Sequence, residues 1–481
     1  GAPPSIQRLR RRRLWIPGLA ALVVVLLVVL LTSGGGSKKL VPGGGSAGNT
    51  YDPLAYDSGK RAQFERDAAA GLSHVLYAKS PGGAIATARR VAAFRPQIQK
   101  AAAAGHADPN VLEGIVFVES AGNPDVIAGR DPANASGLTQ ILAQTGQSLL
   151  GMKIDLARSR FLTKRIRTAQ RHHKSTKKLL AARRKVDPRF DPAQALAATT
   201  RYLAFARGKL HRDDLAVVSY HMGVGNLQSV EAAYGTKAAP YAELYFDSTP
   251  LVHPPAYRLL ARFGDDSSNY YWKVLAAEQI MRLYRTDPAE LARVAALQRN
   301  KASAEEVLHP RASTRVFSTP ASLRRAEQSG QLRPLPSDPA KYGFAIDPGM
   351  GSMAPRLGQR PSQYRSLRPE ALGALAYIAA GVRKIGGSKQ PLVVTSTVRD
   401  GPYQRALVKT NIEATHAYSL HTTGYAFDIE RSYASRAQAL AFQFMLDRLT
   451  ALNLIAWARE PRAIHVTVSS AARPLASLVP R

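Results

Sequence analysis

The sequence predicts a multidomain protein with an N-terminal transmembrane helix, a mostly α-helical domain and a C-terminal α+β domain that contains an antiparallel sheet. Three observations lead to this prediction. An uncharged apolar run, residues 14–31, directly follows a cluster of arginines. From residue 51 to about residue 281, apolar residues recur three and four positions apart, as in helices. Beyond residue 340, helical periodicity alternates with short β-rich runs, which is typical of an α+β domain.

Length and composition restrict the class of protein. A chain of 481 residues is long enough for more than one hydrophobic core. Its 45% hydrophobic and 21% charged residues exclude wholesale disorder. The 66 Lys and Arg against 34 Asp and Glu give a net charge of +32, which indicates an anionic partner such as nucleic acid, a membrane or an acidic cell wall. Because the chain has no cysteine, disulfides, thiol nucleophiles and cysteine-ligated metals are excluded.

The N-terminal region predicts a location at the cell membrane. Residues 1–13 form a basic tail, and the 18 residues Leu14 to Leu31 are just long enough to span a bilayer as a signal anchor. The positive-inside rule then places the tail in the cytoplasm and the rest of the chain outside, after a Gly/Ser linker at 32–50. A cleaved signal peptide, and hence secretion, is the alternative. Either topology argues against nucleic acid as a partner.

One helix within residues 51–310 carries a carboxylate on its apolar face. Asp108 is a suitable N-cap, and Pro109 suits the first helical position. Glu119 continues the apolar stripe of this helix near its C-terminus, where both burial and the helix dipole raise a carboxyl pKa. Such a group suits a general acid at neutral pH, although a Glu that pairs with an arginine or faces water is the alternative. The stripe consists of Leu112, Ile115 and Val116.

Two further motifs follow Glu119-Ser120 in the chain. They are Ser136-Gly137-Leu138-Thr139-Gln140-Ile141 and Ser219-Tyr220-His221-Met222-Gly223-Val224-Gly225-Asn226. With these three ordered motifs, residues 105–235 resemble the lytic transglycosylases of the soluble-lytic-transglycosylase, or goose-type-lysozyme-like, superfamily. The resemblance implies a lysozyme-like domain over 51–310 that cleaves the MurNAc-GlcNAc strand of peptidoglycan.

The resemblance also implies the roles of single residues. Glu119 would protonate the glycosidic oxygen and then take a proton from the 6-hydroxyl of the sugar, so that no cofactor is needed. A hydrolase, in contrast, normally uses two carboxylates. Gly137 would let the backbone approach the glycan, and Thr139 and His221 depart from the family's usual Met and Asn. The residues implied in substrate binding are Ser136, Gly137, Gln140, Tyr220 and His221.

A strongly basic insertion, residues 151–190, separates the second and third motifs. It has fourteen Lys and Arg against Asp155 and Asp187. The pattern predicts a helical hairpin, either simply solvated or acting as a clamp on anionic wall polymers or lipid headgroups. After it, residues 236–310 are rich in tyrosine, including Tyr270, for which packing in the core or the cleft wall is expected.

Residues 341–481, after a Pro-, Ser- and Arg-rich connector at 311–340, predict the α+β domain. Helices are expected at 369–385 and 435–452, and strands at 392–398, 455–459 and 463–469. Strand alternation places Asp428 on one face of a strand and His465 on one face of another, so that both can converge with His421. Two imidazoles and a carboxylate form a zinc set with an open fourth position. Structural histidines are the alternative.

The same region resembles the D-alanyl-D-alanine carboxypeptidase and hedgehog-type zinc peptidases. The resemblance rests on Ser419-x-His421-x-x-Gly424-x-Ala426-x-Asp428 and on Thr395-Ser396-Thr397-Val398-Arg399 with Gln404. It implies zinc as a cofactor and Arg399 as a ligand for a substrate carboxylate or carbonyl. The family has a general-base Glu three residues before the last His, but Arg462 stands there. Glu460 is the candidate base, and a domain that binds stem peptide without cleaving it is the alternative.

The sequence thus predicts a membrane-anchored enzyme that remodels peptidoglycan on the outer side of the cytoplasmic membrane. A helical domain would cleave the glycan, and a zinc-peptidase-like domain would bind or cleave stem peptide. The alternative is a non-catalytic cell-wall-binding scaffold with degenerate enzyme domains.

Overall fold

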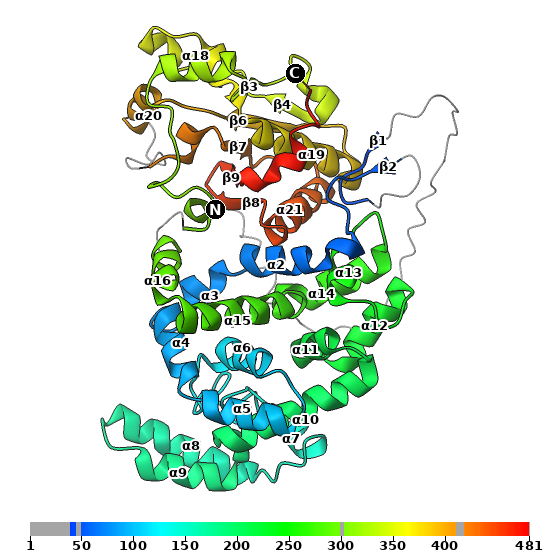
Figure 1. Ribbon diagram of the computed structural model, residues 1–481, viewed down its shortest axis with the longest axis vertical. Coiled ribbons are helices and arrows are strands. Elements are labelled where there is room, and N and C mark those ends of the chain that lie inside the picture. The colour runs from blue at the N-terminus through cyan, green and yellow to red at the C-terminus, as the bar shows by residue number, and fades with distance from the viewer. Residues whose placement is uncertain (1–38, 45–49, 299–302, 410–417, 481) are drawn as a thin grey trace. The chain divides into compact units, whose positions relative to one another are not determined.

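Helices make up most of the chain between residues 61 and 297 (Figure 1). The structure is a computed structural model that describes residues 39–44, 50–298, 303–409 and 418–480. The helices are α2 (Arg61–Gly71), α3 (His74–Lys79), α4 (Ala84–Ala92), α5 (Arg95–Ala104), α6 (Pro109–Ser120), α7 (Ala143–Ser148), α8 (Leu156–Arg171), α9 (Lys177–Val186), α10 (Pro192–Leu210), α11 (Asp213–Met222), α12 (Val224–Tyr234), α13 (Tyr241–Phe246), α14 (Pro254–Ser268), α15 (Tyr270–Thr286) and α16 (Pro288–Leu297).

Helix α6 has the start that the sequence predicts. The side chain of Asp108 accepts a hydrogen bond from the backbone N–H of Asn110, and Pro109 occupies the first turn. The helix ends where Ala121 adopts a left-handed conformation and its N–H bonds to the carbonyl of Phe117. The apolar residues of the predicted stripe are buried, and α6 packs along α15 (Figure 1).

The C-terminal part contains a five-stranded sheet with the order β4-β6-β7-β9-β8. Its central pairs are antiparallel, whereas the edge strand β4 pairs with β6 in parallel. The predicted antiparallel sheet is therefore corrected to a mixed one. The parallel edge is missed because β4 has only three residues, which show no alternation. The strands are β4 (Phe344–Ile346), β6 (Leu392–Ser396), β7 (Ala426–Glu430), β8 (Ile455–Arg459) and β9 (Ala463–Val468).

The predicted helices of this part are confirmed as α19 (Pro369–Gly386) and α21 (Arg436–Ala451), and α20 (Gly401–Val408) is added. The segment predicted as a connector has local structure of its own. It contains α18 (Pro320–Gln328), whose N-cap Thr319 forms a capping box, and β3 (Arg333–Pro334), which pairs with β5 (Ser366–Leu367). The short helix α17 (Ser303–Leu308) precedes it.

Buried polar contacts join the helical part to the C-terminal part. The guanidinium of Arg448 in α21 donates to the carbonyl oxygens of Phe246 and Leu54 at 2.7 and 3.0 Å. The hydroxyl of Tyr377 in α19 donates to Oδ1 of Asp52 at 2.8 Å. The apolar residues around these contacts belong to one continuous core. Residues of the two parts therefore share buried surface instead of meeting only through a linker.

The predicted basic tail, the membrane anchor 14–31 and most of the linker lie outside the described residues. Among the helices that the structure does describe, none combines the length and the apolar character needed to cross a bilayer.

Candidate active site and candidate metal centre

Glu119 lies in the last turn of α6 and faces the first residue of α15. Its Oε1 accepts a hydrogen bond of 2.7 Å from the hydroxyl of Tyr270. The two helices approach closely at Gly114, where an added Cβ would lie 2.9 Å from the carbonyl oxygen of Val274. A side chain at residue 114 would therefore push the helices apart. This close approach is what brings the tyrosine and the glutamate together.

The surroundings of Glu119 raise the pKa of its carboxyl group towards neutral pH. Burial raises the pKa of Glu119 to about 7, although the hydrogen bond from Tyr270 and the charge of Lys273 both lower it. Lys273 itself pairs with Asp266 at 2.9 Å. A carboxyl group with a pKa near the working pH can both donate and accept a proton.

Aromatic rings surround this carboxyl group. The ring of Tyr220 stacks on Tyr270 with centroids 6.3 Å apart, and His221 stacks on the same tyrosine at 5.3 Å. The hydroxyl of Tyr220 donates to the carbonyl of Thr139 at 2.7 Å. Nδ1 of His221 lies 3.0 Å from Oγ of Ser267, and burial lowers the pKa of this histidine. The third motif is thus brought beside Glu119 with an uncharged imidazole at neutral pH.

The second motif, residues 136–141, forms a tight loop between two isolated β-bridges, Ile127 to Ser136 and Ser136 to Ile141. Gln140 adopts a left-handed backbone conformation, and its Nε2 donates to the carbonyls of Gly137 and Val126 at 2.8 and 3.2 Å. Oγ of the buried Ser136 donates to a neighbouring carbonyl. These side chains therefore shape the loop, while their predicted contacts with substrate remain a prediction.

The structure explains the glycine at position 137 differently from the prediction. Its φ is +83°, and an added Cβ would lie 1.8 Å from the carbonyl oxygen of Arg189. The glycine therefore allows the loop to lie against the chain of the basic insertion. Approach of the glycan is not needed to explain it.

Arg189 is buried and holds this loop in place. The sequence did not predict this role. The guanidinium makes an ion pair of 2.7 Å with Asp187, and both side chains are fully buried. It also donates to the carbonyls of Pro132, Asn134 and Ile141 at 2.6 to 3.1 Å. The many basic residues of 151–190 predict a solvated surface. No pattern in the sequence distinguishes the one arginine that is buried from its solvated neighbours.

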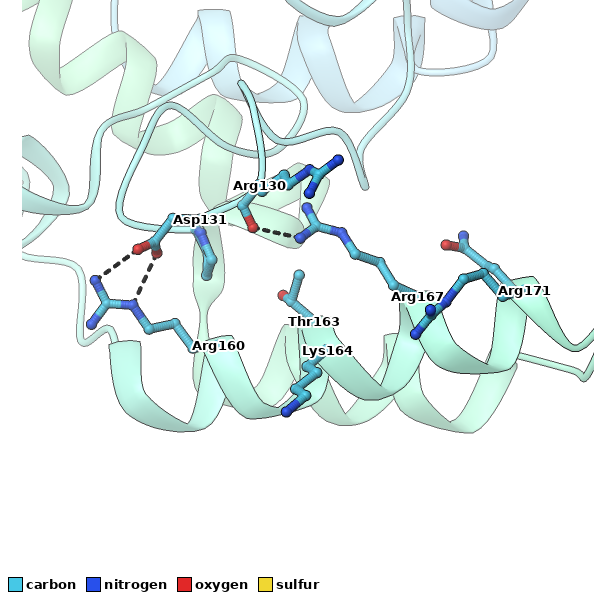
Figure 2. Close-up of a pocket in the computed structure, with 9 residues that line it drawn as sticks. Arg130, Asp131, Arg160, Thr163, Lys164, Arg167 and Arg171 are labelled. Carbon is cyan, nitrogen blue, oxygen red and sulfur yellow. Dashed lines mark hydrogen bonds and ion pairs between the residues drawn. The ribbon is translucent and has the colours of Figure 1, made fainter.

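The rest of residues 151–190 forms the predicted helical hairpin, α8 and α9. Not all of it is solvated, since Arg183 is buried and pairs with Asp125 at 3.0 Å. One face of α8 and the 130–132 loop enclose a cavity of about 860 Å³ with five cationic side chains and one acid (Figure 2). The cationic residues are Arg130, Arg160, Lys164, Arg167 and Arg171.

Two of these arginines are held in place within the cavity wall (Figure 2). Arg160 binds both carboxylate oxygens of Asp131 at 2.9 and 3.1 Å, which neutralises the one acid among the described residues that line the cavity. Arg167 donates to the carbonyl of Arg130 at 2.6 Å. The guanidinium of Arg130 has no polar partner among the described residues, so it is available to an anion.

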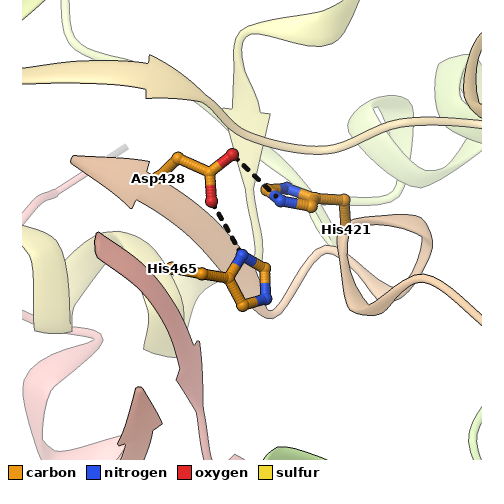
Figure 3. A group of neighbouring side chains, drawn as sticks. All are labelled: His421, Asp428 and His465. Carbon is orange, nitrogen blue, oxygen red and sulfur yellow. Dashed lines mark hydrogen bonds and ion pairs between the residues drawn. The ribbon is translucent and has the colours of Figure 1, made fainter. Parts of the chain in front are cut away.

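His421, Asp428 and His465 converge in the C-terminal part, and their ligand atoms all lie within 4.8 Å of one another (Figure 3). Nε2 of His421 lies 3.2 Å from Oδ2 of Asp428, and Nδ1 of His465 lies 2.7 Å from Oδ1. Strand pairing explains part of this, because Asp428 in β7 is directly opposite His465 in β9. Two nitrogens and an oxygen at these separations fit a zinc ion bound by three protein ligands.

The charges of His421 and Asp428 suit a cation, whereas His465 carries a proton on both ring nitrogens near neutral pH and must release one to bind a metal. Burial and the charge of Arg399 lower the pKa of His421 to about 4. Burial disfavours an ionised Asp428, but the two histidines outweigh burial and hold its pKa well below the usual range. Burial also lowers the pKa of His465, but the hydrogen bond to Asp428 and the charge of Glu305 raise it to about 9. A neutral imidazole and an ionised carboxylate are the forms that bind zinc.

The other predicted residues of this part lie around the same centre. Nη2 of Arg399 is 3.4 Å from Oδ2 of Asp428, and Nη1 donates to Gln404 at 3.1 Å. Glu460 lies in the turn between β8 and β9, and its charge affects the pKa of His465 and of Arg399. A cavity of about 710 Å³ extends past Gln404 and Ser419. Glu305 also reaches this centre, although no pattern in the sequence indicates it.

The comparison with protein families found one match, and it lies in the helical part. A family model described as the transglycosylase SLT domain matches residues 96–161 and 166–241. The matched ranges contain Glu119, the 136–141 loop and the third motif, and neither range extends into the C-terminal part. No curated protein matches the chain. These residues are therefore similar to transglycosylase SLT domains.

Proposed function

We propose that this protein cleaves peptidoglycan strands between MurNAc and GlcNAc, with Glu119 as the only catalytic carboxylate. The protonated Glu119 donates its proton to the glycosidic oxygen, and the bond from that oxygen to the anomeric carbon breaks. The resulting carboxylate takes the proton of the 6-hydroxyl on the same sugar. The 6-oxygen then bonds to the anomeric carbon, which closes a 1,6-anhydro ring. Glu119 ends protonated, and no water is consumed.

The contact between Tyr270 and Glu119 is the observation that carries this proposal. The hydroxyl donor stabilises the carboxylate that exists between the two proton transfers. Burial provides the opposite influence, because it holds the proton on the group before the reaction. The stacked rings of Tyr220 and His221 form the wall against which a sugar would lie. Ser136, Gly137 and Gln140 would contribute the loop on the other side of the substrate.

For the C-terminal part we propose a zinc-binding domain, similar to D-alanyl-D-alanine peptidases, that recognises stem peptide. His421, Asp428 and His465 would hold the ion, and the partly buried Arg399 would bind a peptide carboxylate or carbonyl. A bound zinc ion would polarise a peptide carbonyl as a Lewis acid. Glu460 is the residue proposed to move the proton if the domain cleaves peptide, and otherwise the domain serves recognition alone.

We further propose that the cavity of α8 binds anionic wall polymers or lipid headgroups. Its arginines, fixed by Asp131 and by backbone carbonyls, present a concentrated positive charge at the surface. An anchor at residues 14–31 would place all three sites on the outer side of the cytoplasmic membrane, where these anions occur.

Release of soluble fragments from purified peptidoglycan tests the catalytic proposal. The Glu119→Gln variant should lose about a hundredfold to ten-thousandfold in rate, as expected for a general acid and base. Glu290→Gln removes the same charge from a partly exposed position of α16, where Glu290 pairs with Arg293, and should act like the parent protein. Binding of peptidoglycan without release by the parent protein would instead support a non-catalytic scaffold.

A further inference from the structure

The candidate metal centre includes a carboxylate that comes from far away in the sequence. Glu305 lies in α17, which packs on β8 and β9, and its side chain is buried. Its Oε1 is 3.3 Å from Nε2 of His465 and accepts a hydrogen bond of 3.2 Å from Oγ1 of Thr467. The resemblance to zinc peptidases covers residues after 341 only, so it gives no role to this glutamate.

The two nitrogens of His465 face different acids. Nδ1 faces Asp428 at 2.7 Å, whereas Nε2 faces Glu305. Because the two ring nitrogens point outward in different directions, Glu305 lies on the side of the imidazole that is turned away from Asp428. A metal ion held with Asp428 would therefore be bound through Nδ1, and the proton of His465 would remain on Nε2.

His421 has a matching arrangement. Its Nε2 faces Asp428, and its Nδ1 lies 2.7 Å from the carbonyl oxygen of Thr397. Each histidine thus has one nitrogen directed at the centre. The other nitrogen of His421 is hydrogen-bonded to an outer carbonyl, and Nε2 of His465 lies at ion-pair distance from Glu305 and 3.4 Å from Oγ1 of Thr467. Outer acceptors of this kind fix the ring and its tautomer and strengthen a ligand histidine.

We propose that Glu305 is the positioning residue that holds His465 as an Nδ1 ligand, so that the metal centre depends on α17. This inference rests on the proposed zinc centre. Glu305 lies on the side of the His465 ring that is turned away from Asp428. It is therefore unsuitable as a substitute for the general-base glutamate, whose position is occupied here by Arg462. Its contribution is to hold the proton on Nε2 and to add a negative charge beside the cation.

Zinc titration of the full chain against a chromophoric chelator tests the proposal, with zinc as the only ligand added. We expect Glu305→Gln to weaken zinc binding about tenfold and Glu305→Ala up to about a hundredfold, because glutamine retains an acceptor for Nε2–H. Glu306→Gln, which makes the same charge change at the next residue of α17, should change the affinity less than about twofold.

Nitrogen chemical shifts of the histidines provide a readout that a merely structural role would not alter. The zinc-loaded parent should show His465 protonated on Nε2 and bound through Nδ1, and Glu305→Ala should lose this preference. Equal zinc affinity in the parent and both Glu305 variants would overturn the inference while leaving the zinc centre intact. A parent protein that binds no zinc would overturn the centre itself, and the inference with it.

Discussion

The hydroxyl of Tyr270 donates a hydrogen bond of 2.7 Å to Oε1 of Glu119, although the two residues are 151 positions apart in the sequence. The bond favours the carboxylate, whereas burial favours the protonated acid, and the balance sets the pKa of Glu119 at about 7. Because the acid must be protonated to begin the reaction, activity should fall as the pH rises through this value.

Replacing Tyr270 with Phe tests this balance. Without the hydroxyl donor the pKa of Glu119 should rise, so the alkaline limb of kcat/KM should move to higher pH. The plateau should fall about tenfold to a hundredfold, because a hydrogen bond to the charged carboxylate is lost. Tyr364→Phe removes a similar contact, of 3.0 Å to Asp400, outside the glycan site and should change neither quantity. A limb that moves to lower pH in Tyr270→Phe would contradict the assignment.

The buried ion pair of Arg189 and Asp187 should be a main support of the 136–141 loop. Arg189→Ala leaves a buried carboxylate without its partner and should lower the free energy of unfolding by about 3–5 kcal/mol. Arg184→Ala breaks a more exposed pair with Asp125 and should cost at most about 1 kcal/mol. Denaturant unfolding of both variants measures the difference. Equal losses would mean that Arg189 does not have the special role assigned to it.

The cationic cavity should bind anions in a salt-dependent manner. Removing Arg130 and Arg171 together should weaken binding to anionic wall polymer by about 1 kcal/mol for each cation at low salt. The difference should fade as salt shortens the Debye length below about 8 Å. Lys100→Ala changes an exposed cation of α5 and serves as the control in co-sedimentation. If the double variant bound as well as the control at low salt, the cavity would not be the binding site.

The proposed zinc centre predicts that the purified protein contains one zinc ion, and that the His421→Ala variant loses it. Elemental analysis after dialysis measures the ratio of metal to protein. His172→Ala removes an exposed histidine of the hairpin and should retain the metal. Zinc retained equally by the parent and both variants would place the ion elsewhere.

Local patterns allowed much of the fold to be predicted. The N-cap and the apolar stripe of α6 were enough to single out Glu119, and strand alternation was enough to bring Asp428 and His465 together. Contacts between distant segments were not predictable in this way. Tyr270 meets Glu119 because Gly114 lets two helices approach, and no local pattern in the sequence signals that pairing.

The burial of charged side chains was also not predictable from the sequence. Arg189 belongs to an insertion, residues 151–190, with fourteen basic residues, yet it is fully buried and donates to three carbonyls. Glu305 belongs to a short polar helix, yet it reaches the centre formed by His465. Whether a charged side chain is solvated or paired depends on which segments fold against it, and composition alone does not contain that information.

Digestion of peptidoglycan in water enriched with oxygen-18 tests most directly the central claim that Glu119 cleaves glycan without water. The account predicts that every new muramic end is a 1,6-anhydro ring and that no fragment gains heavy oxygen. New reducing ends that carry one oxygen-18 atom would contradict it. Such ends would require hydrolysis and a second carboxylate, for which Asp266, near enough to affect the pKa of His221, is the first residue to replace.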